Sequence, residues 1–242
     1  MAGTRRGLAA KDPSNRKTTR LARLGALLRG ATAMKIEFVS DIACPWCAVG
    51  LYSLEKALAN IGDAIPVQVQ FEPFELNPSM PPEGEDATEH LSRKYGAAPE
   101  QLARSRAAMR ERGAAVGFAF GDRPRVWNTF DAHRLIHWAG TQGKQRELKH
   151  ALLSAYHAHA ENPGSHEVLL RLVAECGLDV DRARAILDSD EYADEVRERE
   201  RFWQERGIHS VPAVVIDGRH LISGGQPPEV FEQALRQIAA AA

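Results

Sequence analysis

The sequence predicts an α/β fold in which one sheet is assembled from both ends of the chain around a helical block. Three observations lead to this prediction. Near the start of the body of the chain, a strand pattern, a helix pattern and a second strand pattern follow one another, which is a βαβ unit. The middle of the chain shows only helical spacing of apolar residues. Strand patterns return near the end as a hairpin, and a last helix follows it.

The chain of 242 residues is 44% apolar and 26% charged, which is typical of a globular protein. Its longest unbroken aliphatic run, residues 213–216, is far shorter than the ~20 residues that span a bilayer, so we expect no membrane partner. Three cysteines exclude a disulfide-rich secreted scaffold. The net charge of −1 hides an acidic body, because residues 34–242 hold 23 basic and 31 acidic side chains. Such a body is a poor candidate for binding nucleic acid.

Residues 1–33 differ from the rest, because they hold eight basic side chains and one acid, Asp12, with no strand-like alternation. We interpret them as a basic, poorly ordered N-terminal extension; an Arg-rich transit peptide and an over-extended start are the alternatives. They lack the apolar core of a secretory signal, so a cytoplasmic location is expected. Beyond them we expect a domain formed by residues 34–78 and 208–242, with a helical insertion over residues 79–207.

The βαβ unit begins with residues 35–40, whose largely apolar run predicts a buried strand. A helix should begin at Pro45, since proline suits the first helical position, and it should end at Gly62. The apolar residues between them recur at spacings of three and four, which gives the helix one apolar face. Residues 65–71 alternate apolar and polar side chains, as expected of a second strand.

The middle of the chain predicts a succession of helices. One should open at Pro99, and another should be capped by Asn128. Three more show apolar faces, which are Leu148, Leu152 and Tyr156; Leu169, Leu172, Val173 and Cys176; and Tyr192, Val196 and Trp203.

The end of the chain predicts a hairpin and a helix. Residues 213–216 and 220–223 have the character of strands, and Asp217-Gly218 between them is a strong hairpin turn signal. Pro227 or Pro228 then opens the last helix.

One constellation carries chemical specificity: Cys44-Pro45-Trp46-Cys47 lies where the first strand gives way to the helix. The first amides of a helix lack partners and its dipole is positive there, so a Cys44 thiolate should be stabilised and its pKa should fall below the usual ~8.5. Cys47 lies one turn deeper, on the apolar face, and is suited to resolving a mixed disulfide. We expect Pro45 and Trp46 to tune the exposure of Cys44 and to contact the substrate.

A cysteine pair has two other uses. A zinc site would need two further ligands, and the sequence offers neither a second cysteine pair nor a suitably spaced histidine, so no metal is expected. An inert structural pair is the other alternative. Redox chemistry is favoured because the motif accompanies a βαβ pattern.

Val211-Pro212, directly before the strand of residues 213–216, is the second candidate element. Proline cannot donate a hydrogen bond to a sheet ladder, which puts Pro212 at the start of the strand. His209 lies three residues earlier and could approach Cys44, where a positive imidazole would lower the thiol pKa further. A solvated loop histidine is the alternative. We take Val211 and His209 as candidate substrate-binding residues.

Four segments of the chain together have a family resemblance. They are Ser40-Asp41-Ile42-Ala43-Cys44-Pro45-Trp46-Cys47-Ala48-Val49-Gly50; Phe74-Glu75-Leu76-Asn77-Pro78; Phe130-Asp131-Ala132-His133-Arg134-Leu135; and Val211-Pro212 with Ser223-Gly224-Gly225-Gln226. The chain resembles the DsbA family of thioredoxin-fold oxidoreductases, and within it the FrnE-like branch, over residues 35 to about 240. The resemblance implies a thioredoxin-like α/β fold with a large all-helical insertion between its βαβ and ββα halves. It also implies that Cys44, Cys47 and a cis Pro212 are the catalytic residues.

The activity that the resemblance implies is thiol–disulfide exchange or disulfide isomerisation, with protein or low-molecular-weight thiols and disulfides as partners. No cofactor is expected, although glutathione could serve as a redox partner. The resemblance identifies no client, and the sequence predicts neither the oligomeric state nor the direction of exchange.

The chain departs from the family pattern in two places. Around the proline the family tends to have Gly-Val-Pro-x-Phe, where this chain has Ser210-Val211-Pro212-Ala213-Val214. Many thioredoxin-like proteins also carry an acid six residues before the first cysteine, where this chain has Phe38. Glu37 points to the other face of the strand, so the sequence offers no evident buried proton acceptor for Cys47.

Two alternative functions stay open. Kappa-class glutathione transferases and 2-hydroxychromene-2-carboxylate isomerases share the layout with inserted helices, but they characteristically carry serine in place of the first cysteine, so Cys44 argues against them. The other alternative is a client-binding, chaperone-like protein whose disulfide is incidental.

Overall fold

The computed structural model describes residues 33–241, and from Met34 onward the chain forms one compact unit. Its main sheet has four strands among the described residues, in the order β2-β1-β5-β6. β1 runs parallel to β2 and antiparallel to β5, so strands from both ends of the chain meet at the centre of the sheet. The predicted N-terminal extension, residues 1–33, lies outside the described residues except for Ala33. The strands are β1 (Met34–Ser40), β2 (Val67–Pro73), β5 (Ala213–Ile216) and β6 (His220–Ser223).

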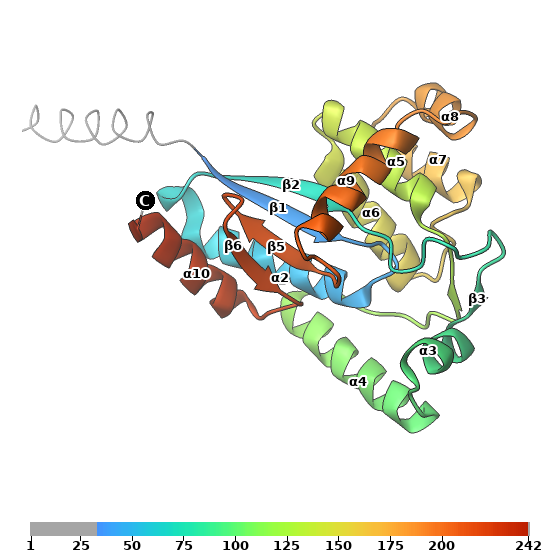
Figure 1. Cartoon of the computed structure of the whole chain (residues 1–242), viewed down its shortest axis with the longest axis horizontal. Coiled ribbons are helices and arrows are strands. Elements are labelled where there is room, and N and C mark those ends of the chain that lie inside the picture. The colour runs from blue at the N-terminus through green and yellow to red at the C-terminus, as the bar shows by residue number, and fades with distance from the viewer. Residues whose placement is uncertain (1–32, 242) are drawn as a thin grey trace, which may run out of the picture. The chain divides into compact units, whose positions relative to one another are not determined.

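Helices pack around this sheet (Figure 1). α2 (Pro45–Ile61) connects β1 to β2, a 3-10 turn (Gly62–Ala64) follows it, and α10 (Pro228–Ala241) packs along α2 after β6. The insertion between β2 and β5 supplies the other helices, and Figure 1 shows α5 to α9 grouped apart from the α3–α4 pair. They are α3 (Ala87–Tyr95), α4 (Pro99–Val116), α5 (Phe130–Thr141), α6 (Gln145–His157), α7 (His166–Glu175), α8 (Val180–Leu187) and α9 (Ala193–Glu205). This topology is the predicted thioredoxin-like α/β fold with a helical insertion, so the predicted fold class is confirmed.

The core continues from the sheet into the insertion. Phe38 on β1, Leu54 on α2 and Phe231 on α10 are wholly buried, and they share one apolar cluster with Leu135 and Leu152 of the insertion. Burying an aliphatic or aromatic side chain of this size contributes about 1.5–3 kcal/mol. The division into domains after residue 78 and before residue 208 therefore stays a prediction. Among the described helices, none combines the length and the apolar character that crossing a bilayer requires.

The insertion contains more than the sequence pattern predicts. A short antiparallel ladder joins β3 (Glu85–Asp86) to β4 (Arg125–Val126). α3 was not distinguishable by apolar spacing because only Ala87 and His90 in it are buried. Its start depends instead on Asp86, whose carboxylate accepts hydrogen bonds from the amides of Thr88 and Glu89.

Two element boundaries also differ from the prediction. β2 begins at Val67 rather than at residue 65. The N-cap of α5 is Thr129 rather than Asn128, although the Asn128 side chain does accept a hydrogen bond from the amide of Phe130 at 2.8 Å. The hairpin is confirmed, because Ile216 pairs with His220 and residues 217–219 form the turn between them. The amide of Arg219 donates to the carbonyl of Ile216 at 3.1 Å, and Asp217 and Gly218 both have positive φ, at 49° and 65°.

The loop before β5 approaches α2 closely at Gly50. A Cβ added at Gly50 would lie 3.0 Å from Cγ of Pro212, which is closer than an ordinary contact, so glycine favours this approach. The Val211–Pro212 peptide bond is cis, as the resemblance implies. The carbonyl of Pro212 accepts a hydrogen bond from the amide of Gly224 at 2.8 Å, which ties the loop after β6 to the same point.

Gly50→Ala should therefore destabilise the protein. In an ordinary helix interior, alanine is more stable than glycine by roughly 0.5–1 kcal/mol, but here its methyl group meets the rigid ring of Pro212. We expect the free energy of unfolding in urea to fall by about 1–3 kcal/mol. Gly140→Ala in α5 is the control, because its methyl group would meet only the flexible end of Gln145, at 3.3 Å. A Gly50→Ala protein that is as stable as the Gly140→Ala protein would contradict the tight contact.

Candidate active site

Cys44 lies at the junction that the sequence predicts. It is the N-cap residue of α2, and Pro45 occupies the first turn. Its residue is only 4% exposed, but it forms part of the wall of a pocket of about 630 Å³. Its thiol donates a hydrogen bond to the carbonyl of Val211 at 3.4 Å. The structure thus brings together the cysteine motif and the Val211-Pro212 segment, which lie far apart in the sequence.

Cys47 follows one turn along α2 and is wholly buried. Both cysteines are present as thiols, and the amide of Cys47 donates to the carbonyl of Cys44 at 3.1 Å. Because Cys47 is wholly buried and Cys44 lines the pocket, a sulfur atom of a substrate can reach the pair only at Cys44.

The two thiols have pKa values shifted in opposite directions. The hydrogen bond that the Cys47 thiol donates is the strongest influence on Cys44; burial opposes it, and the amides of Cys47 and Trp46 add to it, so that the pKa of Cys44 is lowered. Burial and the neighbouring Cys44 raise the pKa of Cys47 well above its ordinary value. Cys44 is therefore the sulfur better suited to act as nucleophile and leaving group, while Cys47 holds its proton more firmly.

The four predicted substrate-binding residues all line this pocket: Pro45, Trp46, Val211 and His209. Trp46 is partly exposed, and the guanidinium of Arg112 lies 6.0 Å from the centre of its ring. His209 is exposed, and it is not among the groups that most strongly set the pKa of Cys44.

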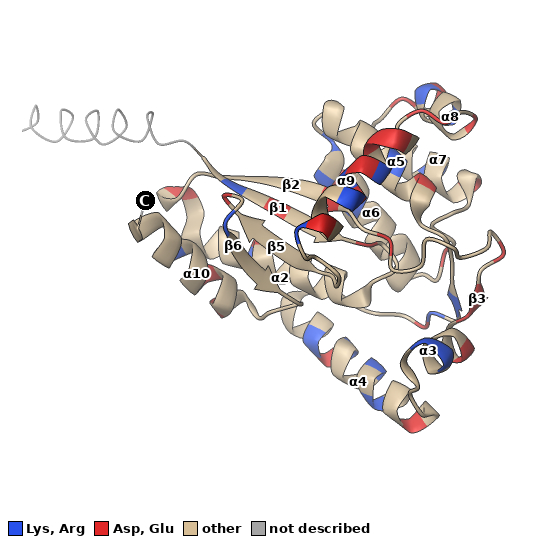
Figure 2. Ribbon diagram, viewed as in Figure 1, with Lys and Arg blue, Asp and Glu red and all other residues tan. Residues whose placement is uncertain are grey.

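The opposite wall comes from the insertion, which sequence reasoning missed. α3 contributes Lys94, α4 contributes Arg106, and Arg123 donates from the segment before β4 to the carbonyl of Ala43 at 2.8 Å. Figure 2 shows basic and acidic residues interspersed over the described part of the chain, and the ribbon of α4 carries both. Within the described lining, however, Glu75 is the one carboxylate, and Arg197 pairs with it. The wall that faces Cys44 is therefore positively charged, although the body of the protein is acidic. Its apolar members are Leu76, Leu91, Tyr95, Leu102 and Met109.

Asp41 belongs to the segment before Cys44, and its sequence position alone predicted no function for it. In the structure, its side chain organises the loop before α2. Its buried carboxylate accepts hydrogen bonds from the amides of Ala43 at 3.0 Å and Leu76 at 2.7 Å, and from the hydroxyl of Thr129 at 2.8 Å. Nε2 of His133 lies 3.4 Å away. Burial alone would raise the pKa of Asp41, but His133 and the two amides hold it below its ordinary value. Asp41, as a carboxylate, therefore joins the loop before α2 to the segment that follows β2 and to the N-cap of α5.

Two other residues with titratable side chains, His137 and Cys176, lie away from this pocket. His137 lines a different pocket, against β2, and burial lowers its pKa. Cys176 is half-buried at the end of α7, where burial raises its pKa. Within residues 33–241, no three His, Cys, Asp or Glu side chains are grouped so as to hold a metal ion.

Asp41→Asn should destabilise the protein and acidify Cys44 further. The substitution removes a charged acceptor from buried donors, so we expect the free energy of unfolding at neutral pH to fall by about 2–4 kcal/mol. The negative charge of Asp41 raises the pKa of Cys44, so its loss should lower that pKa. The two readouts are urea unfolding and the pH dependence of Cys44 alkylation. Equal stability of the two proteins at neutral pH would contradict this role for Asp41.

The stability difference should depend on pH. The pKa of Asp41 is lower in the folded protein than its ordinary value, so its contribution is present above the unfolded pKa and is lost as pH falls through the folded pKa. Wild type and Asp41→Asn should therefore approach each other in stability in acid.

Comparisons with known proteins agree with this geometry. The model of the DSBA-like thioredoxin domain matches residues 35–236. An uncharacterized protein of Bacillus subtilis (strain 168), YwbO, is 29% identical over 203 residues, which cover 83% of this chain and 94% of that protein. A probable DsbA oxidoreductase from Streptomyces coelicolor is 38% identical with a TM-score of 0.82, covering 86% of this chain and 91% of that chain.

A more distant structure shares the fold. A 2-hydroxychromene-2-carboxylate isomerase is 14% identical with a TM-score of 0.67, covering 86% of this chain and 99% of that chain. The domain model spans most of the chain and includes Cys44, Cys47 and Pro212. The chain therefore belongs to the family of DSBA-like thioredoxin domains.

Proposed function

We propose that this protein is a thiol–disulfide oxidoreductase that exchanges disulfides with protein or small thiols through Cys44 and Cys47. The observation that carries the proposal is the environment of Cys44. Its thiol is acidified at the first turn of α2 and faces a pocket that can receive part of a substrate. A stabilised thiolate is a good leaving group from a mixed disulfide, which favours exchange at this sulfur.

The oxidising direction begins with the Cys44–Cys47 disulfide. A substrate thiolate attacks Sγ of Cys44, and Cys47 leaves with the electron pair of the broken bond and takes up a proton. A second substrate thiolate then attacks the substrate sulfur of the mixed disulfide, and Cys44 leaves as its stabilised thiolate. The substrate dithiol becomes a disulfide, and the cysteine pair gains two electrons. In the reducing direction, Cys44 attacks a substrate disulfide and Cys47 resolves the mixed disulfide.

The pocket walls favour a substrate with apolar and negatively charged groups near its reactive sulfur. Lys94 and Arg106 supply positive charge, while Leu102 and Met109 supply apolar contact. Trp46 is half-exposed beside Cys44 and offers an aromatic surface to the same substrate. A thiol-bearing acidic peptide fits this description, and so does glutathione as a small redox partner.

Three finer assignments belong to the proposal. Membership of the FrnE-like branch is supported by the sequence segments quoted above, of which residues 74–77 line the pocket. Disulfide isomerisation is expected of a reduced Cys44 that can attack a non-native disulfide. A cytoplasmic location stays a prediction; in such a reducing compartment the pair would be held largely as a dithiol, which favours the reductase and isomerase directions.

The alternative of a glutathione-dependent isomerase has less support. Its likeness to this chain is one of fold, at 14% identity. Cys44 also stands where such enzymes characteristically carry serine. The client-binding alternative predicts that function survives without either thiol, so one set of variants separates all three.

Cys44→Ser should reduce insulin reduction to the background rate, because the attacking sulfur is lost. Cys47→Ser should instead accumulate a mixed disulfide between Cys44 and the substrate, since nothing resolves it, and intact-mass measurement detects that adduct. Insulin reduction that survives Cys44→Ser would contradict the proposed function. Glutathione-dependent isomerisation of a chromene carboxylate, or suppression of client aggregation by the double serine variant, would favour one of the alternatives.

The pH dependence of alkylation tests the acidity of Cys44. Iodoacetamide reacts with the thiolate, so the rate at Cys44 should rise with pH through a midpoint below that of an ordinary thiol. Cys47→Ala removes the donor that lowers this pKa, while Cys47→Ser keeps a hydroxyl donor there. The midpoint should therefore lie higher in Cys47→Ala than in Cys47→Ser. Equal midpoints would show that Cys47 does not stabilise the thiolate.

A further inference from the structure

Resolution by Cys47 requires a proton acceptor in the protein interior. Cys47 is wholly buried, and its pKa is well above the ordinary value, so it cannot pass its proton directly to bulk water. Phe38 occupies the strand position where an acid would be expected, and Glu37, on the other face, pairs with Lys35 at 2.9 Å. Asp41 is already engaged by its hydrogen-bond donors and its lowered pKa makes it a weak base.

One face of α6 passes beneath the active-site loop. Gln145 and the backbone of Phe71 on β2 exchange two hydrogen bonds, both of 3.0 Å. Three turns later, Nε2 of His157 lies 2.8 Å from the carbonyl of Ile42, two residues before Cys44. Lys149 follows Gln145 by four residues and precedes His157 by eight, so it lies on the same face. It is therefore held between β2 and the loop that leads into Cys44.

Lys149 is a buried amine whose pKa is shifted so that it could accept a proton. Lys149 is only 1% exposed. Among its titratable neighbours, Cys47 influences the pKa of Lys149 most strongly, ahead of Asp41 and Cys44. Burial lowers the pKa of Lys149 to about 8, against the opposing influence of these groups. A neutral amine, which can accept a proton, is therefore accessible near neutral pH.

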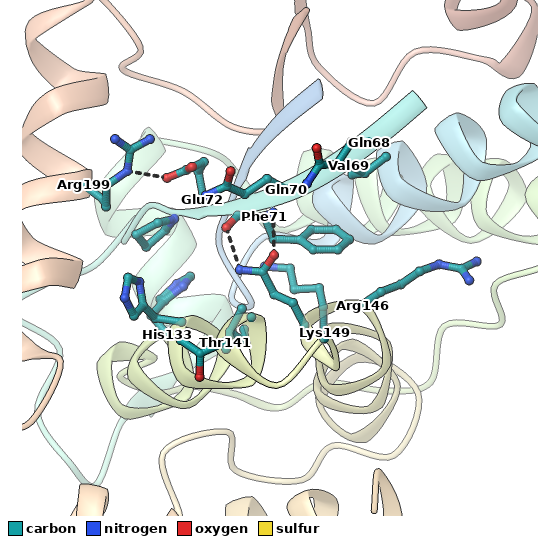
Figure 3. A pocket seen from close by; sticks show the side chains of 16 residues that line it. Gln68, Val69, Gln70, Phe71, Glu72, His133, Thr141, Arg146, Lys149 and Arg199 are labelled. Carbon is teal, nitrogen blue, oxygen red and sulfur yellow. Dashed lines mark hydrogen bonds and ion pairs between the residues drawn. The ribbon is translucent and has the colours of Figure 1, made fainter. Parts of the chain in front are cut away.

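A second pocket gives Lys149 its own route to water. This pocket has a volume of about 520 Å³ and lies between β2, α5 and α6. Figure 3 shows the side chain of Lys149 rising from α6 toward β2 inside it, with His133 and Thr141 on the α5 side. Among the described residues it shares none of its lining with the pocket at Cys44. Protons can thus reach Lys149 while a substrate fills the other pocket.

We propose that Lys149 accepts the proton of Cys47 when Cys47 resolves a mixed disulfide, and that this proton leaves through the pocket lined by β2, α5 and α6. The inference rests on the proposed function. The proton moves from Sγ of Cys47 to Nζ of Lys149, and the Cys47 thiolate attacks Sγ of Cys44. The Cys44–Cys47 bond forms, and the substrate sulfur leaves with the electron pair of the broken bond. The Lys149 ammonium then returns its proton to water in the pocket.

Two other groups near Lys149 or its pocket are less suited to this transfer. His157 is held against the Ile42 carbonyl, and burial places its pKa well below the ordinary value. Glu72 accepts hydrogen bonds from Arg199 at 2.7 Å and from the indole of Trp203 at 3.2 Å. The titratable and charged groups that face Lys149 or its pocket are Asp41, Cys44, Cys47, Glu72, His133, His137, Arg146, His157 and Arg199.

The test isolates the resolving step. Wild type and Lys149→Met are converted to a mixed disulfide between Cys44 and thionitrobenzoate, and release of the coloured thiol is followed by stopped flow across pH. Lys149→Met should resolve about 10- to 100-fold more slowly at neutral pH, with its pH profile displaced to higher pH. Alkylation of Cys44 should change by less than about threefold, because Cys44 is stabilised by Cys47 and the helix amides. Lys144→Met, an exposed lysine before the same helix, is the matched control and should behave as wild type.

Two further variants separate proton transfer from charge and from folding. Lys149→Arg keeps the positive charge but cannot give up its proton, so it should remain slow. Lys149→Ala should be rescued by methylamine, which can enter the pocket, with a rate that rises with the concentration of neutral amine. Replacing a buried charge by methionine is often neutral for stability, and thermal unfolding of each variant checks this. Lys149→Gln provides the same comparison if the methionine variant is unstable.

The outcomes are distinct. Wild-type resolution in Lys149→Met or Lys149→Arg would overturn the proposal, and so would equal losses in resolution and in Cys44 alkylation without amine rescue. If wild type itself never releases the thiol, the proposed function fails rather than this inference.

Discussion

The site depends on the close approach of two segments that lie 167 residues apart in the chain, at Cys44 and Val211. The approach is permitted by two glycines. Gly50 lacks a side chain where the ring of Pro212 lies, and Gly225 lacks one where the carbonyl of Trp46 lies. Because the loop before β5 can come this close, the thiol at the first turn of α2 faces a backbone carbonyl and an open pocket rather than the apolar core.

The difference between the two thiols follows from a single helical turn. Cys44 receives hydrogen bonds from the amides at the start of α2, and its charge can be stabilised there. Cys47 lies in the core, where a low dielectric penalises the same charge. The pair therefore has one thiol with a lowered pKa, which the proposed function uses as the attacking and leaving sulfur, and a second thiol with a raised pKa.

The helical insertion serves the site from two sides. Its α3–α4 pair forms the basic and apolar wall opposite Cys44, with Lys94 and Arg106. Its α6 passes beneath the site and carries Lys149 toward Cys47. Asp41 fixes the active-site loop itself, because its carboxylate holds this loop to the segment after β2 and to the start of α5. The insertion thereby shapes both the entry of a substrate and the surroundings of the resolving thiol.

Local signals in the sequence were sufficient to predict the strands of the main sheet and the helices α2 and α10 that pack beside it. They also predicted the position of the cysteine motif at the start of α2 and the hairpin at Asp217-Gly218. Each depends on residues that are neighbours in the chain. The sequence could not predict the roles of Asp41 and Lys149. In the sequence, Asp41 has the pattern of a turn residue. Lys149 has the pattern of a polar surface position on a helix whose apolar face includes Leu148 and Leu152. Only the tertiary structure decided that both are buried, and that Asp41 influences the pKa of Cys44 and Lys149 that of Cys47. The groups that enclose a charge come from distant elements, such as Thr129, 88 residues from Asp41. The spacing of residues along one helix or strand does not indicate which distant elements will pack around a given side chain.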